Sequence, residues 1–382
     1  RDADFFLQLL PGPRDREGVP EIIRFWLSKF ETHSDANPVS VGVIYGPSGC
    51  GKTSLVRAGI IPRLPDDVIS IYVQATAEDT ERTLHDQIIS RLSLIRDPAN
   101  DPQQDVVESF AMIRRLQRRR VVIFIDQFEQ WLFANPDGSR AALVQALRQC
   151  DGEYLQCVLM VRDDFWMGVT RLMQALDYTI AENVNATAVD LFDESHARNV
   201  LALFGAAYQK LPENREQLSP SQNEFLDQAV QYLAAGGRVI CVQLALLTEM
   251  LKNRSWDHAE GLFDDGGAGL GMRFLDETFD SELARRRTRI HAEGAHRVLR
   301  ALLPEATSRI KGSVRSKEEL AQAASYREKS SFRELLAILD REMHLITPTD
   351  RIATDSLSSD LQSATDSSNA SDSGDSAEPG SS

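Results

Sequence analysis

The residues best suited to phosphate chemistry lie between Gly46 and Thr53, in a Gly-x-x-x-x-Gly-Lys-Thr pattern. This spacing lets backbone N–H groups surround a β-phosphate, while Lys52 reaches the β/γ oxygens and the Thr53 hydroxyl ligates Mg²⁺. A glycine-rich turn without a ligand is the alternative, but an apolar run before the pattern and a helix-competent run after it favour a bound triphosphate. The residues expected to line the nucleotide are Gly46, Pro47, Ser48, Gly49, Cys50, Gly51, Lys52, Thr53 and Ser54.

A second candidate is Asp126, which follows the five-residue apolar run Val121–Ile125. A buried strand that ends in a carboxylate is typical of the group that holds Mg²⁺ in nucleotide sites. The alternative is an ordinary helix N-cap. Downstream of a phosphate loop, the magnesium function is favoured, with Thr53 as the other metal-binding residue.

Glu129 lies three residues beyond Asp126 and is the candidate that orients the attacking water, with Gln127 as a second possibility. Phosphoryl transfer needs positioning and charge neutralisation more than covalent chemistry, so a carboxylate here is sufficient. The alternative is that Glu129 caps the helix that contains Trp131.

Arg162 ends the apolar run Cys157–Val161 and should emerge at the carboxyl edge of a sheet, where ligands bind in open α/β folds. Its guanidinium is a candidate γ-phosphate contact that distinguishes a triphosphate from a diphosphate. The alternative is a salt bridge to Asp163 or Asp164. The catalytic set predicted from the sequence is therefore Lys52, Asp126, Glu129 and Arg162.

Cys50 stands in the glycine-rich loop at a position where only its backbone is needed. A small filling side chain is the favoured interpretation, although a helix terminus would lower its pKa and make it sensitive to oxidation.

The elements that position these residues form an α/β pattern. Apolar strand candidates at 41–45, 68–73, 121–125 and 155–161 are separated by helical patterns, including 21–31, 81–94 and 104–116. Such alternation is typical of a parallel sheet covered on both faces. The prediction is a doubly wound P-loop NTPase domain over residues 38–205, preceded by an entry segment and helix over 1–37.

Helices dominate from about Asp193. A capping box at Ser219, Pro220 and Gln222 predicts a helix to about Ala234, and a dense apolar stripe predicts another over 239–252. Three shorter helices follow at about 296–303, from Ser316 and from Ser331, and then a strand at 343–348. The prediction is an α-helical domain over 206–292 and a partial winged-helix domain over 293–350.

Composition bounds the class of protein. The chain has 382 residues, 42% hydrophobic and 26% charged, with a formal net charge of −15. An acidic balance argues against a nucleic-acid backbone as the main partner. Four cysteines without zinc spacing indicate reduced thiols in the cytoplasm, and no apolar run is long enough to span a bilayer. Residues 351–382 are rich in Ser and Asp and are expected to be disordered.

The glycine-rich loop, the run Asp126-Gln-Phe-Glu129 and the run Val161-Arg-Asp-Asp-Phe-Trp166 together resemble the novel STAND NTPases, over nearly all of residues 1–350. That resemblance implies ATP or ADP held between a P-loop core, a helical domain and a winged helix, with Mg²⁺ and slow hydrolysis. It also implies protein partners or self-association on activation. Similar segments follow bacterial Ser/Thr protein kinase domains, so the chain is expected to be a fragment of a longer signalling protein.

The sequence departs from the family pattern at two places. Relatives usually carry a proline that packs on the adenine where this chain has Cys241, and the end of the winged helix has no counterpart after Pro348. The predicted function is a nucleotide-dependent signalling switch. A DNA-binding initiator-type ATPase and a non-hydrolysing ATP-binding scaffold are the alternatives.

Overall fold

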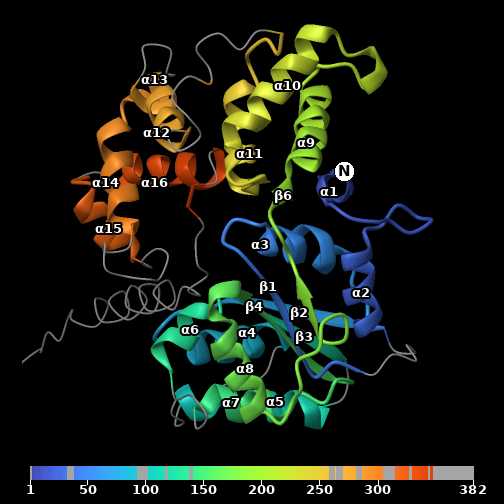
Figure 1. Cartoon of the computed structure of the whole chain (residues 1–382). Coiled ribbons are helices and arrows are strands. Elements are labelled where there is room, and N and C mark those ends of the chain that lie inside the picture. Colours follow the sequence, from blue (N-terminus) through green and yellow to red (C-terminus); the bar gives the residue numbers. More distant parts are fainter. Residues whose placement is uncertain are drawn as a thin grey trace, which may run out of the picture. The chain divides into compact units, whose positions relative to one another are not determined.

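The computed structural model describes residues 2–31, 38–92, 102–116, 119–136, 141–257, 263, 270–280, 286–303, 315–326, 329–342 and 345–346. Within them, a parallel sheet has the strand order β2-β3-β4-β1-β5 (Figure 1). Its strands are β1 (Val41–Gly46), β2 (Val68–Gln74), β3 (Arg120–Asp126), β4 (Leu155–Arg162) and β5 (Ala186–Ala188). The predicted doubly wound α/β fold is confirmed.

The strands read as uninterrupted apolar runs because both faces of the sheet are covered. Successive residues of β3 alternate between two cores: Val121, Ile123 and Ile125 face one, and Val122 and Phe124 face the other. The first core also contains side chains of α4 (Thr80–Leu92), α5 (Pro102–Leu116), α6 (Glu129–Ala134), α7 (Ala142–Leu147) and α8 (Trp166–Ala175). The second contains α2 (Glu21–Phe30) and the turns that follow the phosphate loop.

The helix after the glycine-rich loop begins at Lys52, but its geometry changes quickly. Only α3 (Lys52–Ser54) is α-helical; a π-helical turn over Leu55–Ile60 and a 3-10 turn over Ile61–Arg63 follow. Pro62 has no N–H and cannot continue an α-helical ladder, which accounts for the end of the segment.

The sheet's order brings β1 and β4 together although β2 and β3 separate them in sequence. Gly46 is the register partner of Arg162, and Gln74 is the partner of Asp126. Because the strands are parallel, the loops that follow β1, β3 and β4 all leave from the same edge.

A third core contains side chains of α1 (Asp2–Leu9), α9 (Glu194–Ala207), α10 (Pro220–Leu233), α11 (Cys241–Leu251) and α12 (Leu270–Leu275). The predicted capping box at Ser219 and Gln222 is present at the start of α10. α11 begins at Cys241, later than expected, because Val239 pairs with Phe192 in a two-residue antiparallel ladder of β6 (Phe192–Asp193) and β7 (Arg238–Val239). The expected domain boundary at 205/206 falls inside α9, and the division into domains stays a prediction.

The remaining described helices are α13 (Arg286–Arg289), α14 (Ala292–Leu302), α15 (Lys317–Ala323) and α16 (Lys329–Ala337), followed by a π-helical turn over Ile338–Glu342. The predicted capping box of Ser316 and Glu319 is present. The one predicted at Ser331 is wrong, because the backbone is already helical from Lys329 and the Glu334 N–H therefore belongs to the helix interior.

Most of the expected 343–348 strand and the whole 351–382 tail lie outside the described residues. Among the helices that the structure describes, none combines the length and the apolar content needed to cross a bilayer.

Candidate functional site

The phosphate loop is shaped by glycines that no other residue replaces without strain. Gly49 and Gly51 have φ values of +79° and +97°, in the region that favours glycine. At Gly46 the constraint is close approach, since a Cβ would lie 1.9 Å from the backbone oxygen of Val189, beyond β5. The loop therefore turns sharply at the end of β1 and presents its backbone at the sheet edge.

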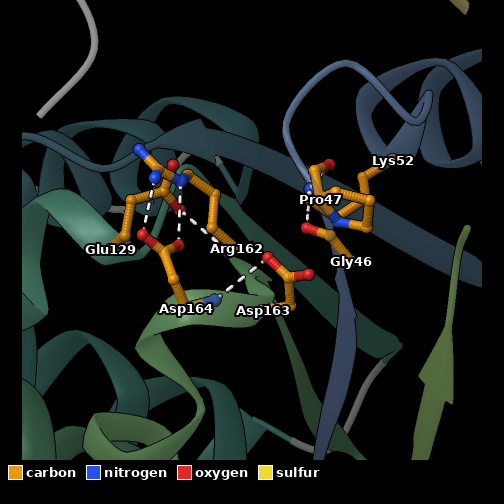
Figure 2. A network of polar contacts seen from close by, with 7 residues as sticks. All are labelled: Gly46, Pro47, Lys52, Glu129, Arg162, Asp163 and Asp164. Carbon is orange, nitrogen blue, oxygen red and sulfur yellow. Dashed lines mark hydrogen bonds and ion pairs between the residues drawn. The ribbon is translucent and has the colours of Figure 1, made fainter. Parts of the chain in front are cut away.

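Lys52 extends back along this loop rather than into solvent (Figure 2). Its Nζ donates hydrogen bonds to the backbone oxygens of Gly46, at 2.7 Å, and Pro47, at 3.0 Å. The ammonium thus lies on the loop that the sequence assigns to the phosphates. Of the other predicted loop residues, Pro47, Ser48 and Gly49 are half-buried, Cys50 is buried and Ser54 is exposed at the end of α3.

Thr53, at the start of α3, lies beside Asp126, the last residue of β3. The Thr53 hydroxyl donates to Asp126 Oδ2 at 2.6 Å, and the backbone N–H of Gln127 donates to Oδ1 at 2.7 Å. The side chain of Asp126 does not cap α6, whose N-cap is Phe128. A hydroxyl beside a buried carboxylate fits Mg²⁺, which keeps several waters and takes few protein ligands. Among the described residues there is no cluster of three or more His, Cys, Asp and Glu that would form an all-protein metal cage.

Glu129 is the first residue of α6 and is only 5% exposed. Its Oε2 accepts the backbone N–H of Arg162 at 3.3 Å, so α6 and the end of β4 are joined at the sheet edge (Figure 2). Burial raises the pKa of this carboxyl above its usual value, and the charge of Asp126 adds to the shift while Lys52 opposes it. A raised pKa makes this carboxylate a stronger base than an exposed glutamate.

Arg162 forms the ion pair that the sequence offered as its alternative function. Its Nε lies 3.0 Å from Asp164 Oδ1 and its Nη2 lies 2.6 Å from Oδ2 (Figure 2). The guanidinium also lies over the Phe165 ring, 5.7 Å from the centroid. Asp163 has a different function, since its Oδ1 accepts the backbone N–H of Asp164 at 3.0 Å. The structure places Arg162 beside Gly46; a contact with the γ-phosphate stays a prediction.

Cys50 and Cys241 meet where the start of α11 reaches the phosphate loop. The Cys241 thiol donates to the backbone oxygen of Cys50 at 3.4 Å, and a Cβ on Gly49 would lie 2.7 Å from Ile240 Cγ2. Burial raises the pKa of the Cys50 thiol, more than Lys52 lowers it, so the suggestion of a lowered pKa and an oxidation-sensitive thiol is wrong. Burial also raises the pKa of Cys241, to about 12.

Sequence reasoning missed Tyr72. Its hydroxyl donates to Asp126 Oδ2 at 2.5 Å, and the guanidinium of Arg57 lies over its ring at 5.3 Å from the centroid. Tyr72 reads as one residue among several in a β-branched strand, and only the pairing of β2 with β3 brings it to Asp126. No signal in the sequence marks it.

The chain was compared with protein families, curated sequences and solved structures. No curated protein sequence matches the chain. Among solved structures, a Walker-type ATPase of Pyrococcus abyssi is 17% identical with a TM-score of 0.45, covering 87% of this chain and 93% of its own. The Aeropyrum pernix ORC2 protein in its ADP form is 14% identical with a TM-score of 0.44, covering 97% and 99%. The Aeropyrum pernix ORC1 protein in complex with DNA is 15% identical with a TM-score of 0.45, covering 96% and 98%.

At these levels of similarity, none of the three structures assigns a function to this chain. The family comparison is more specific: residues 26–203 match the family model described as Novel STAND NTPase 1. The matched segment holds the phosphate loop, Asp126, Glu129 and Arg162. Over this segment, just under half of the chain, the protein matches the novel STAND NTPases, and its fold is that of a nucleotide-binding P-loop NTPase.

Proposed function

We propose that the protein binds Mg-ATP at the carboxyl edge of its sheet, hydrolyses it slowly and uses the bound nucleotide to switch conformation. The observation that carries this proposal is the meeting of Thr53 and Asp126, 2.6 Å apart, beside a loop that already holds Lys52. These are the three side chains that a P-loop site requires for a metal and for β/γ-phosphates.

Each residue has a separate task in this proposal. Lys52 exchanges its bonds to Gly46 and Pro47 for phosphate oxygens, and the Thr53 hydroxyl and the Asp126 carboxylate hold Mg²⁺ directly or through water. The metal neutralises charge on the phosphates. The glycine-supported backbone supplies N–H donors around the phosphates.

Glu129 and Arg162 complete the hydrolytic part of the proposal. The Glu129 carboxylate accepts a proton from, and orients, the water that attacks the γ-phosphorus. Arg162 leaves Asp164 to contact the γ-phosphate, which makes the site sensitive to the difference between ATP and ADP.

The contact between α11 and the phosphate loop supports the switch. The start of α11 contacts the phosphate loop, where Ile240 and Cys241 lie against Gly49 and the backbone of Cys50. A movement of the loop on nucleotide exchange would therefore also move the start of α11. We propose that the segment 206–292 moves relative to the segment 38–205 on nucleotide exchange, with 293–350 as a winged-helix-like latch. All four cysteines are free thiols, which supports a cytoplasmic location. We expect the conformational change to alter binding to protein partners.

The test is nucleotide binding by the full chain, measured with fluorescent ATP and ADP analogues, together with phosphate release. Lys52→Ala should lose about 100-fold or more in affinity, because one charge-assisted contact to phosphate contributes several kcal/mol in a partly buried site. Nucleotide-dependent hydrogen exchange at residues 238–251 should accompany binding. ATP binding without turnover or exchange changes would favour the scaffold, and salt-dependent duplex binding would favour the initiator-type ATPase.

A further inference from the structure

Asp126 is held by three hydrogen-bond donors from three different parts of the chain. Oδ2 accepts from Thr53 at 2.6 Å and from Tyr72 at 2.5 Å, and Oδ1 accepts the Gln127 N–H at 2.7 Å. The carboxylate is 3% exposed, so solvent contributes little to its orientation. Its direction is therefore determined by these donors.

The three donors leave one of the two Asp126 oxygens able to accept a further hydrogen bond. Each carboxylate oxygen accepts about two hydrogen bonds. Thr53 and Tyr72 together occupy the capacity of Oδ2, while Oδ1 keeps one position beyond the bond from Gln127. Without the Tyr72 hydroxyl, Oδ2 would keep only the bond from Thr53 and would gain an open position, so either oxygen could accept a metal-bound water.

Tyr72 is itself held in place. It is the fifth residue of β2, its register partner on β3 is Phe124, and its half-buried ring packs against the core that includes Phe124. Arg57, from the π-helical turn after the phosphate loop, places its guanidinium over the ring, 5.3 Å from the centroid. Tyr72 thus connects the segment that follows the phosphate loop with the end of β3.

We propose that Tyr72 is a positioning residue for the metal site: its hydroxyl holds Asp126 in the orientation in which the carboxylate and Thr53 receive a hydrated divalent cation. This inference rests on the proposed function, because it requires nucleotide to bind with Mg²⁺. Tyr72 does not touch the nucleotide or the reacting atoms. Its contribution is to metal affinity, through Asp126.

Tyr45 provides a matched control on another strand of the same sheet. It is the fifth residue of β1, and its hydroxyl also donates to a carboxylate, Glu182 Oε2, at 2.7 Å. Removing either hydroxyl changes the chain by one oxygen atom, but only Tyr72 contacts Asp126.

The experiment measures binding of a fluorescent ATP analogue to the full chain as MgCl₂ is titrated, and again in EDTA. Tyr72→Phe should raise the Mg²⁺ concentration for half-saturation about tenfold, the lower range for loss of a hydrogen bond behind a metal ligand. Affinity in EDTA should change less than about twofold, and Tyr45→Phe should match the wild type. An unchanged or lowered Mg²⁺ requirement in Tyr72→Phe overturns the inference.

Two further variants separate positioning from a general loss of structure. In an Asp126→Asn background, Tyr72→Phe should add no further change in the Mg²⁺ requirement; an equal change in both backgrounds means that Tyr72 acts elsewhere. Arg57→Gln keeps the hydroxyl but loosens the ring, and should raise the requirement about two- to fivefold. If the wild type binds no nucleotide with or without Mg²⁺, the proposed function fails together with this inference; if only the tyrosine effects are missing, this inference alone fails.

Discussion

Asp164 holds the guanidinium of Arg162 with both carboxylate oxygens, at 3.0 and 2.6 Å, two residues after β4 delivers Arg162 to the sheet edge beside Gly46. The side chain of Asp164 is 51% exposed and that of Arg162 is 20% exposed. A pair this accessible to water contributes only about 0.2–1 kcal/mol. A phosphate arriving at Gly46 can therefore compete with Asp164 for the guanidinium.

The first prediction follows from that competition. Asp164→Asn should increase the ratio of ATP to ADP affinity by about two- to fivefold, because Arg162 no longer gives up an ion pair to reach the γ-phosphate. Arg162→Ala should reduce the ratio. Both are measured by displacement of a fluorescent nucleotide.

Asp163→Asn is the control, because it also removes one negative charge, at the residue next to Asp164. The Asp163 side chain accepts the Asp164 N–H and does not hold Arg162. An equal rise in both aspartate variants would mean that general charge near the loop is responsible. A ratio that stays unchanged in Arg162→Ala would leave Arg162 with its structural ion pair alone.

Glu129 gives the second prediction. Glu129→Gln keeps the size of the side chain but cannot accept a proton, so phosphate release at saturating ATP should fall by about 10²–10⁴-fold while the affinity for ATP stays within a few-fold. Single-turnover and binding measurements on the same preparation separate the two quantities. Equal turnover in the Gln variant would reject the water-positioning assignment.

The raised pKa of Glu129 makes a third prediction, on stability. Relative to the unfolded chain, whose Glu pKa is near 4.5, the folded state favours the protonated carboxyl. The stabilising contribution is therefore complete below pH 4.5 and is lost as pH rises through the folded-state pKa. Glu129→Gln imitates the protonated form, so its melting temperature should exceed that of the wild type at neutral pH.

The difference between the two proteins should shrink as the pH approaches 4.5 from above. Melting curves of both, without nucleotide, give this comparison. A constant difference across the range would mean that altered hydrogen bonding of the side chain, rather than the charge of the buried carboxyl, determines the change.

Much of the fold was predictable from the sequence because contiguous apolar runs mark buried parallel strands. The limits of β3 and β4 differ from those predicted by one residue at either end of β3 and one at the end of β4. The three-residue β5 and the two-residue ladder of β6 and β7 are too short to produce a periodic pattern. Their pairing depends on tertiary contacts that a local pattern does not contain.

The site divides in the same way. Gly46 to Thr53 and Asp126 form local motifs, so spacing alone identifies them. The neighbours of these residues come from strand order: β4 next to β1 brings Arg162 to Gly46, and β2 next to β3 brings Tyr72 to Asp126. Neither adjacency follows from residue types, since an apolar run marks a strand but does not give its place in the sheet.

The fourth prediction compares two glycines of the phosphate loop. Gly46→Ala should lower the free energy of unfolding by more than about 3 kcal/mol or prevent folding, because its Cβ would lie 1.9 Å from the Val189 oxygen and backbone must move. Gly51→Ala meets no atom within 4 Å and should cost only the strain of its φ of +97°, about 1–3 kcal/mol. Urea denaturation measures both, and similar losses would contradict the argument from close approach.

The last prediction concerns Cys241, at the position where novel STAND NTPases usually carry proline. Cys241 is the first residue of α11, where proline is well tolerated because its missing N–H has no partner within the helix. Ile240 before it has φ −76° and ψ 121°, the extended conformation that a residue preceding proline prefers.

Cys241→Pro should therefore fold, with a stability gain of about 0.4–1 kcal/mol from a more restricted unfolded chain. If this proline ring packs on the adenine, it should also raise the affinity for ATP and ADP alike, by about two- to fivefold, since both nucleotides share the adenine. Cys241→Ala is the control: it removes the thiol bond to Cys50 without restricting the backbone, and should give neither gain. Equal affinities in the Pro and Ala variants would place the adenine away from α11.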